Sequence, residues 1–294
     1  MKPAPFRYHR ARDIQGTTAL LAELGDQGDD AKIIAGGQSL VAMMNFRLAR
    51  PGHLVDIGPL RELDHLGVGP DGALHIGALT THHTVETAPA GALGPGFAVL
   101  RRAMEWIGHL PIRTRGTVGG SLAHADASAE WCLLAHTLGA ELRATGPQGD
   151  RRLPAAEFFL GPYTSLLEPD ELLTEVVFPR TAPHAALTEF AERRGDFALV
   201  SAVVDLDVED GRVRGGRVGL GGVAPVPVRV PEAEAVLTGG GSFAECADAA
   251  AAAVDPPDDA GGSAAYRRRL VRALVERAAS EALATTETTE AKSR

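Results

Sequence analysis

The stretch TRGTVGGSLAHADASAEW, residues 114–131, holds two adjacent glycines between small hydroxyl residues and ends in an acid and a tryptophan. A similar stretch precedes it at residues 31–44, AKIIAGGQSLVAMM, where Gly-Gly again stands before a polar residue and an apolar run. Glycine permits positive φ and lets an anion approach the backbone N–H groups closely. One Gly-Gly is usually a turn, but two in similar settings suggest two halves of one binding site.

Phosphate is the ligand expected at such loops, because helix N-termini also favour negative charge. The hydroxyl groups of Ser39, Thr117 and Ser121 would add donors. Neither loop matches the GxGxxG or GxxxxGK[ST] pattern, so the usual signatures of nicotinamide and ATP sites are absent. From the residues alone, a pair of plain turns and a phosphate site remain equally open.

Apolar periodicity and turn residues predict a mixture of helices and strands. The first half is expected to contain helices near 17–24, 38–50 and 97–108, strands at 31–35, 53–58 and 73–78, a glycine-rich loop at 114–125, and a helix that runs into a strand over 130–145. The second half is expected to contain an antiparallel hairpin around the DGR turn at 210–212, followed by helices near 243–254 and 263–284. Because no regular βαβ repeat is present, the sequence favours an α+β fold.

Composition limits the classes of function. The chain has 294 residues and a formal net charge of −9, which argues against nucleic-acid binding. Its two cysteines, Cys132 and Cys246, fit no metal-binding spacing and are too few for a four-thiolate iron–sulfur cluster, so any such cluster would lie on another chain. The N-terminus has no apolar signal region and no long apolar run occurs, so a cytoplasmic protein is expected.

Six motifs occur in a defined order: KIIAGGQSL, IGALTTHH, RTRGTVGGSLAHADASAE, RRGDFALVS, VGLGGVAPVPVR and YRRRL. In this combination, over residues 3–284, the chain closely resembles the FAD-binding medium subunit of molybdenum hydroxylases, the carbon monoxide dehydrogenase and xanthine dehydrogenase family. The resemblance implies an FAD-binding domain of the p-cresol methylhydroxylase (vanillyl-alcohol oxidase-like) type, built of two α+β subdomains. A C-terminal domain with a three-stranded antiparallel sheet and helices would follow it.

The corresponding domain division is residues 1–180 for the FAD-binding domain and 184–286 for the C-terminal domain. Pro179 and Pro183 bracket the polar link between them. The last residues, 287–294, are polar and are predicted to be a disordered tail.

The resemblance also implies which residues hold FAD, with the two glycine loops gripping its diphosphate from both sides. The implied residues are Ile33, Ile34, Ala35, Gly36, Gly37, Gln38, Ser39 and Leu40 in the first loop, and Thr117, Val118, Gly119, Gly120 and Ser121 in the second. Glu130 stands where xanthine dehydrogenase-like chains place an aspartate that contacts the cofactor. Glutamate keeps the carboxylate acceptor, but its longer side chain places that acceptor differently. Asp126 competes with it for the cofactor, or caps the following helix.

Phe197 corresponds to an aromatic or apolar position near the flavin ring, while simple core packing is the other reading. The lysine that xanthine dehydrogenases carry nearby is replaced by Leu199 or Val200. His82, His83, His109 and His124 invite a metal interpretation, but adjacent histidines on a strand point to opposite faces, so no metal site is predicted. Arg267–Arg269 are expected to form a solvated face or to contact a partner. No catalytic side chain is predicted, because the cofactor would supply the chemistry.

Three functions follow. The first is an electron-transfer subunit that takes electrons from iron–sulfur clusters of a small subunit. It would work beside a molybdenum-cofactor large subunit, in a dimer of heterotrimers, and pass electrons to a quinone, oxygen or NAD. The second is a stand-alone FAD oxidase or monooxygenase, with an acid or base drawn from His124, Asp126 or Tyr163. The third is a non-catalytic nucleotide-binding protein or scaffold. The substrate and the final acceptor are not specified by the sequence.

Overall fold

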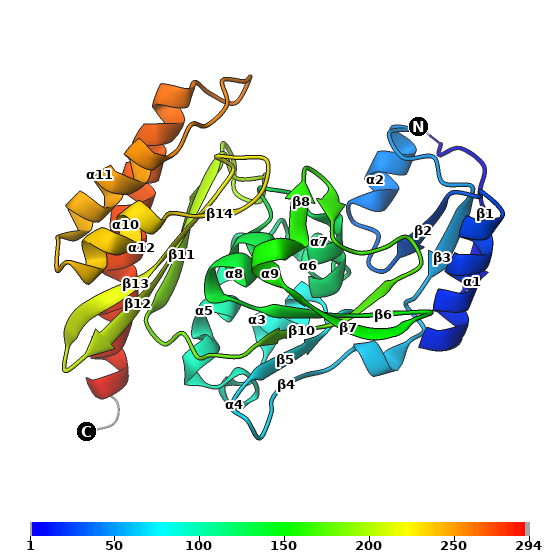
Figure 1. The fold of residues 1–294 in the computed structure, drawn as a ribbon, viewed down its shortest axis with the longest axis horizontal. Coiled ribbons are helices and arrows are strands. Elements are labelled where there is room, and N and C mark those ends of the chain that lie inside the picture. The colour runs from blue at the N-terminus through cyan, green and yellow to red at the C-terminus, as the bar shows by residue number, and fades with distance from the viewer. Residues whose placement is uncertain (1, 292–294) are drawn as a thin grey trace.

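The N-terminal block is a small parallel sheet, at the blue end of the ribbon in Figure 1. The computed structural model describes residues 2–291. Strand order in this block is β1-β3-β2, with β1 at Arg7–Arg10, β3 at His53–Asp56 and β2 at Ala31–Ile34. Helix α1 (Ile14–Asp26) links β1 to β2 and begins where Asp13 accepts a hydrogen bond from the N–H of Gly16, at 2.6 Å. The first glycine motif therefore leaves the sheet at the carboxyl end of β2.

The middle block is a five-stranded antiparallel sheet with short helices on one face (Figure 1). Its strands, in spatial order, are β4 (Leu66–Val68), β5 (Leu74–Gly77), β10 (Leu172–Phe178), β6 (Glu141–Gly146) and β7 (Gly149–Pro154). The helical elements of this block and of the segment leading to it are α2 (Leu40–Asn45), η1 (Arg61–Leu63), α3 (His82–Thr87), α4 (Ala90–Leu93), η2 (Pro95–Phe97), α5 (Ala98–Ala103), α6 (Leu110–Arg113), α7 (Val118–His124), α8 (Glu130–Leu138) and α9 (Ala155–Phe158). A small hairpin, β8 (Phe159–Gly161) and β9 (Thr164–Ser165), completes the block.

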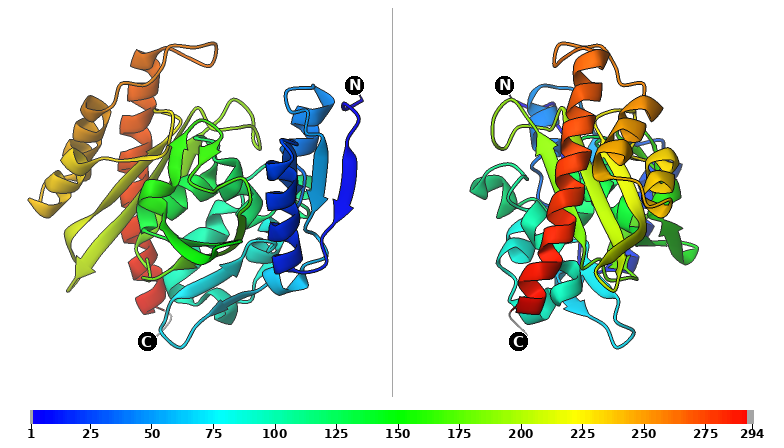
Figure 2. Two further views of the ribbon diagram at one scale, coloured as in Figure 1. Left: turned by 45° about the vertical axis from the view of Figure 1, so that its right-hand side comes forward. Right: turned by 90° about the vertical axis from the view of Figure 1, so that its left-hand side faces the viewer.

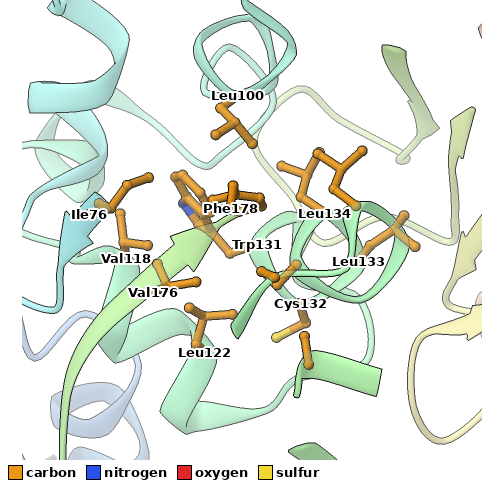
Figure 3. Close-up of a cluster of buried hydrophobic side chains, with 14 of the residues drawn as sticks. Ile76, Leu100, Val118, Leu122, Trp131, Cys132, Leu133, Leu134, Val176 and Phe178 are labelled. Atoms are coloured by element: carbon orange, nitrogen blue, oxygen red, sulfur yellow. The ribbon is translucent and has the colours of Figure 1, made fainter. Parts of the chain in front are cut away.

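The core of the middle block surrounds Trp131 on α8 (Figure 3). The Trp131 side chain is fully buried, and its Nε1–H donates to Nδ1 of His82 at 3.0 Å. Burial lowers the pKa of His82 to about 4, so the imidazole is neutral and can accept this bond. The hydrogen bond fixes α3 against α8 and removes His82 from any surface role.

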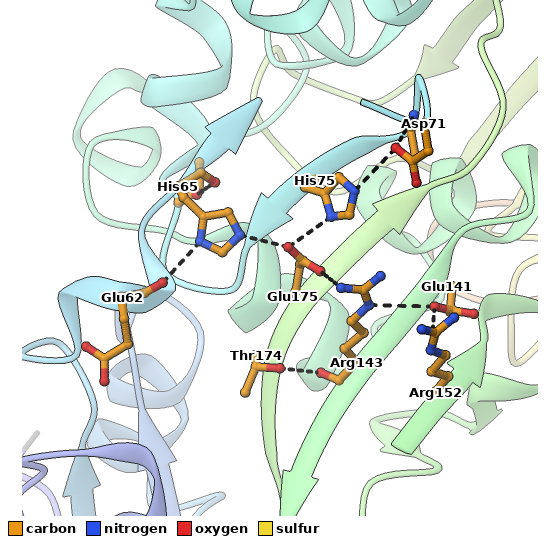
Figure 4. A network of polar contacts seen from close by, with 11 residues as sticks. Glu62, His65, Asp71, His75, Glu141, Arg143, Arg152, Thr174 and Glu175 are labelled. Atoms are coloured by element: carbon orange, nitrogen blue, oxygen red, sulfur yellow. Dashed lines mark hydrogen bonds and ion pairs between the residues drawn. The ribbon is translucent and has the colours of Figure 1, made fainter. Parts of the chain in front are cut away.

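The other face of the same sheet carries a polar network (Figure 4). Oε1 of Glu175 on β10 lies 2.9 Å from Nε2 of His65 and 3.1 Å from Nδ1 of His75, while its Oε2 lies 2.7 Å from Arg143. Helices cover one face and charged side chains occupy the opposite one, which is the usual arrangement of an antiparallel sheet with a solvated side.

The C-terminal block packs a second sheet against three helices (Figure 2). Strands β11 (Ala185–Phe190), β12 (Val200–Glu209) and β13 (Arg212–Gly221) are joined by the short β14 (Val228–Arg229), and the helices are α10 (Pro231–Thr238), α11 (Phe243–Ala253) and α12 (Ala264–Ala291). The turn between β12 and β13 places Asp210 and Gly211 at φ of 52° and 69°, as a tight hairpin of this chemistry requires.

The expected α+β architecture is confirmed, including the three long antiparallel strands of the C-terminal sheet. The two-residue strand β14 adds a short fourth strand beside β13. The expected helix over 38–50 is shorter, Leu40–Asn45, since Arg47 adopts φ 59° and ends it. The expected loop over 114–125 is wrong, because α7 (Val118–His124) occupies more than half of it. The predicted division into 1–180 and 184–286 remains a prediction. In the predicted tail, α12 continues through residues 287–291, and residues 292–294 lie outside the described residues.

Arg267 was expected on a solvated face, but its side chain is buried at 6 % exposure. Its guanidinium donates to the carbonyl of Leu199 at 2.5 Å and to that of Gly222 at 3.1 Å. It also forms a two-pronged pair with Asp259, at 2.7 and 2.8 Å. Arg267 therefore ties α12 to Leu199, just before β12, and to Gly222, just after β13.

Replacing Arg267 with lysine is expected to lower the free energy of unfolding by about 2–3 kcal/mol, because one ammonium cannot reproduce the forked donor set of a buried guanidinium. Urea unfolding of the purified chain measures it. Arg277→Lys is the matched control, since Arg277 is exposed and pairs with Glu281 one turn away, and it should change stability by less than about 0.5 kcal/mol. Equal effects of the two substitutions would contradict the anchoring role of Arg267.

Candidate functional site

The first glycine loop, residues 35–39, joins β2 to α2 and presents a run of open backbone donors. Among the described residues, no acceptor is hydrogen-bonded to the N–H of Gly36, Gly37, Gln38 or Ser39. Gly37 adopts φ 71°, a conformation that favours glycine, and Gln38 Nε2 donates to the Gly36 carbonyl at 3.1 Å. Consecutive unpaired N–H groups of this kind form a concave site for an anion.

The second glycine segment, residues 116–121, differs from the expectation that it would offer a matching set of donors. Thr117 is the N-cap of α7, and its Oγ1 accepts from the N–H of Gly120 at 3.0 Å. The N–H groups of Val118 and Gly119 donate to the carbonyls of Thr80 and Ala78, and that of Ser121 donates to Thr117. Those backbone donors are already used within the chain. The hydroxyls of Thr117 and Ser121 and the exposed flank of Gly120 are what this segment can offer a ligand.

The fold brings the two segments into direct contact. A Cβ added to Gly36 would lie 2.0 Å from the carbonyl oxygen of Arg115 and 2.9 Å from Cα of Gly116. A Cβ on Gly120 would meet the Cβ of Ala35 at 3.9 Å. Glycine at position 36 is therefore required by the close approach of the other segment, and the two segments form one continuous surface.

Gly119 has a different role from Gly36. Its added Cβ would lie 2.5 Å from the Cβ of Ala78 and 2.7 Å from the Ala78 carbonyl oxygen. Gly119 is buried, so it allows α7 to pack closely beside β5. Val118 is likewise fully buried in the core of the middle block. Both residues are buried beneath the surface, so they support it and do not lie on it.

The remaining residues implied for the first loop flank it. Ile33 and Ile34 end β2, and Leu40 is the first residue of α2. Each is partly exposed. Ile33 and Ala35 also pack against the small hydrophobic cluster that holds the N-terminal sheet to the middle block. These residues shape the walls beside the open N–H groups.

A cluster of ionisable groups lies where α7 ends and α8 begins. Glu130 is the first residue of α8, and burial, aided by the charge of Asp126, raises the pKa of Glu130 to about 7. Asp126 Oδ1 accepts from the N–H of Ser128 at 2.9 Å, so it caps the turn before α8, whose N-cap is Ala129. The rings of His124 and Tyr163 lie 5.0 Å apart, and the neighbouring Asp126 raises the pKa of Tyr163.

Phe197 lies in the loop between β11 and β12 and is 67 % exposed. Core packing, one of its two readings, is therefore wrong. The same loop bends back at Gly195, whose φ is 87° and whose added Cβ would lie 2.7 Å from the ring of His109. His109 is the N-cap of α6, just before the second glycine segment. An exposed aromatic ring is thus carried by a loop that packs close to the glycine surface.

Sequence reasoning missed Glu189 on β11. This residue is 6 % exposed, and burial together with the charge of Glu130 raises the pKa of Glu189 to about 8. Its cross-strand neighbour Ser201 is fully buried and its hydroxyl has no partner among the described residues. The only signal in the sequence was an acid within the otherwise apolar and neutral stretch ALTEF.

The histidines do not form a metal centre within residues 2–291, where no group of three or more His, Cys, Asp or Glu could hold an ion. His82 lies in the core, whereas His83 pairs with Glu86 at 3.1 Å. No helix in this described range is long and apolar enough to cross a membrane. Cys132 and Cys246 are buried free thiols.

Comparison with known families covers nearly the whole chain. Residues 4–181 match the FAD binding domain in molybdopterin dehydrogenase, and residues 185–282 match the CO dehydrogenase flavoprotein C-terminal domain. The 6-hydroxypseudooxynicotine dehydrogenase complex subunit alpha of Paenarthrobacter nicotinovorans is 40 % identical over 292 residues, with 96 % of each chain covered. The carbon monoxide dehydrogenase medium chain of Afipia carboxidovorans is 36 % identical, with 81 % of this chain and 82 % of the relative covered.

Solved structures agree. A carbon monoxide dehydrogenase from Hydrogenophaga pseudoflava, which lacks the Mo-pyranopterin moiety of its molybdenum cofactor, superimposes with a TM-score of 0.90 at 34 % identity. That match covers 97 % of this chain and 99 % of the other. Quinoline 2-oxidoreductase from Pseudomonas putida 86 gives a TM-score of 0.89 at 35 % identity, over 96 % and 98 % of the two chains.

Proposed function

The chain belongs to the FAD-binding medium subunits of the molybdenum hydroxylases, and we propose that it is an electron-transfer subunit within such an enzyme. In this role it receives electrons from iron–sulfur clusters of a small partner subunit and passes them to an external acceptor. The observation that carries the proposal is the contact between the open donors of residues 36–39 and the second glycine segment.

FAD is the cofactor of this family, and the residues present suit its diphosphate. The N–H groups of Gly36, Gly37, Gln38 and Ser39 would hold phosphate oxygens, since they have no acceptor among the described residues. The hydroxyls of Thr117 and Ser121 would add donors from the other side. Asp126, Glu130 and the exposed ring of Phe197 are the proposed contacts beyond the diphosphate. When bound, FAD supplies one- and two-electron redox chemistry.

The protein's own groups position the cofactor and can hold a proton beside it. The Gly36–Arg115 contact holds the two segments together without a side chain between them, so the donors are positioned before the ligand arrives. Glu130 carries a carboxyl group whose pKa, about 7, lets it hold or release a proton near neutral pH. We infer that it exchanges a proton beside the cofactor.

Partner subunits are part of the proposal. The chain has two cysteines, too few for a four-thiolate cluster, so the iron–sulfur clusters must lie on another chain. The relatives are described as a complex subunit and a medium chain, and an assembly with a molybdenum-cofactor large subunit and an iron–sulfur small subunit, as a dimer of heterotrimers, fits those descriptions. Two buried free thiols support a reducing, cytoplasmic location.

A second candidate is a stand-alone FAD oxidase or monooxygenase. It is favoured by one observation, the grouping of His124, Asp126 and Tyr163 at the end of α7. These groups could serve a substrate directly as acid or base. The proposal of an electron-transfer subunit needs no such cluster.

Purification of the tagged chain from its own cells separates the candidates. FAD, molybdenum and iron are measured per chain after the flavin is released by denaturation and filtration. Flavin that passes the filter as FAD, together with molybdenum and iron on co-purifying chains, is the expected result. Flavin without metal, combined with turnover by the chain alone, would establish the stand-alone enzyme instead. A colourless chain that takes up no added FAD would leave the glycine loops as plain turns.

A further inference from the structure

Arg113 is the last residue of α6 and stands just before the second glycine segment, residues 116–121. Its Nε and Nη2 donate to the two carboxyl oxygens of Glu86 on α3, at 2.9 and 3.0 Å. Its Nη1 donates to the carbonyl oxygens of Ile107 and Gly108, both at 3.1 Å. Four hydrogen bonds from one guanidinium therefore join the end of α6 to α3 and to the turn that precedes α6.

The ion pair between Arg113 and Glu86 is largely shielded from water. The two side chains are 14 % and 23 % exposed. Nδ1 of His83 lies 3.1 Å from the same carboxyl group of Glu86. The hydrogen bond from Arg113, aided by His83, holds the pKa of Glu86 below its usual value, so the pair is charged on both sides at neutral pH.

The beginning of α3 holds the second glycine segment at another place. The N–H of His82 donates to the carbonyl of Gly116 at 3.0 Å, and Thr81 pairs with Thr117 as an isolated antiparallel bridge. A Cβ added to Gly116 would lie 2.9 Å from two atoms of the His82 ring, so the two backbones approach closely. The same helix therefore holds the segment at Gly116 and, one turn further along, at Glu86.

Arg115 lies between these two fixed points, and its backbone meets the first glycine loop. Its carbonyl oxygen is the atom that a Cβ on Gly36 would approach to 2.0 Å. Its N–H donates to the carbonyl of Ile112 in α6 at 3.2 Å, so its position follows that of α6. A shift of Arg113 would therefore move Arg115 relative to the open N–H groups of residues 36–39.

We infer that Arg113 is a positioning residue for the FAD site and that Glu86 fixes its orientation. Arg113 acts through the backbone of Arg115, by setting the distance between the two glycine segments before the cofactor arrives. The inference rests on the proposed function in placing FAD between these segments, and it adds the pair of side chains that sets their spacing.

Arg113→Lys is expected to weaken FAD binding about threefold to tenfold. Lysine keeps the positive charge but cannot donate to two carboxyl oxygens and two carbonyls at once. The tagged full-length chain is purified with the chains that accompany it, FAD is removed at high salt, and rebinding is followed by flavin fluorescence. The dissociation constant for FAD and the melting temperature of the flavin-free protein are both measured.

Glu86→Gln separates positioning from simple attraction between charges. It removes a negative charge beside Arg113, so attraction alone would strengthen the binding of an anionic diphosphate. Positioning predicts the opposite, a weakening of about threefold to tenfold, because an amide has one acceptor oxygen and cannot hold both arms of the guanidinium. In Gly36→Ala the two segments are already forced apart, so adding Arg113→Lys should weaken FAD binding by less than about twofold more.

Arg151→Lys is the matched control. Arg151 on β7 donates to both carboxyl oxygens of Glu171, at 2.5 and 2.6 Å, and to the carbonyl of Leu166 at 2.7 Å. These partners lie outside both glycine segments. Each of the two lysine variants should lower the melting temperature by about 2–4 °C, but Arg151→Lys should bind FAD as tightly as the wild type.

Unchanged FAD affinity in Arg113→Lys, or tighter binding in Glu86→Gln, would overturn the role of this pair and leave the proposed function intact. Equal losses of affinity in Arg113→Lys and Arg151→Lys would also overturn it, since Arg113 would then only stabilise the fold. A wild-type protein that binds no FAD would instead refute the proposed function, and this inference with it.

Discussion

Gly36→Ala is expected to lower the affinity for FAD about tenfold or more and the free energy of unfolding by about 1–3 kcal/mol. The added Cβ would lie 2.0 Å from the carbonyl oxygen of Arg115, 2.7 Å from its carbon and 2.9 Å from Cα of Gly116. All three are backbone atoms, so no flexible side chain can move aside. The two glycine segments must separate, and the open donors of residues 36–39 then lose their position relative to Thr117 and Ser121.

The measurement is the amount of FAD retained by the purified variant, followed by titration of the apo chain with FAD. Gly25→Ala is the matched control, because Gly25 lies in α1 of the same block and an added Cβ would meet nothing within 4 Å. It should retain FAD fully and should be neutral or up to about 1 kcal/mol more stable, as alanine favours a helix over glycine. Full flavin content in Gly36→Ala would refute the assignment of this contact to the cofactor site.

Glu189→Gln is expected to make the protein more stable at alkaline pH, with little effect at acid pH. The pKa of Glu189 is raised from its ordinary value of 4.5 to about 8, mainly by burial and further by the charge of Glu130. Between these values the folded chain binds more protons than the unfolded one, so wild-type stability falls as pH rises through this window. Across the whole window the loss amounts to roughly 5 kcal/mol, and the neutral amide avoids it.

Urea unfolding of wild type and Glu189→Gln at pH 5, 7 and 9 measures the difference. The two proteins should be similar at pH 5, and the variant should exceed the wild type progressively toward pH 9. Glu192→Gln is the control, since Glu192 is an exposed carboxylate three residues further along, and its difference from wild type should not vary with pH. A Glu189→Gln difference that is flat across this range would show that Glu189 is charged and solvated.

Sequence reasoning identified the elements whose structure depends on nearby residues. The hairpin between β12 and β13 follows from Asp210 and Gly211, which supply the positive φ angles that a tight turn needs. The end of α8 follows from Gly139, at φ 71°, in the same way. The two Gly-Gly motifs could be recognised as parts of one site because their composition is unusual, and their order among the other motifs identified the family.

Contacts between residues far apart in the chain could not be predicted from the sequence, because no local pattern encodes them. The sequence assigned the same role to both glycine pairs, but the structure gives them different roles. Gly36 lets the backbone of Arg115 come close, and Gly119 lets α7 pack against Ala78. Unpaired N–H groups are found in the first loop and not in the second. Phe197 could equally have been a core residue until the fold exposed it.

Arg267 and Glu189 are two further residues whose environment the sequence did not predict. The run Arg267–Arg269 has the composition of a solvated helix face, and only the meeting of α12 with the ends of β12 and β13 buries Arg267 on two carbonyl groups. Glu189 is an ordinary carboxylate in the sequence, and its unusual pKa arises because the middle block and the C-terminal sheet exclude water from it. The sequence by itself determined the family, the α+β class and the residues of the glycine loops. Which of those residues are free to bind a ligand was decided by tertiary packing, because both hydrogen-bond occupancy and burial depend on groups far away along the chain.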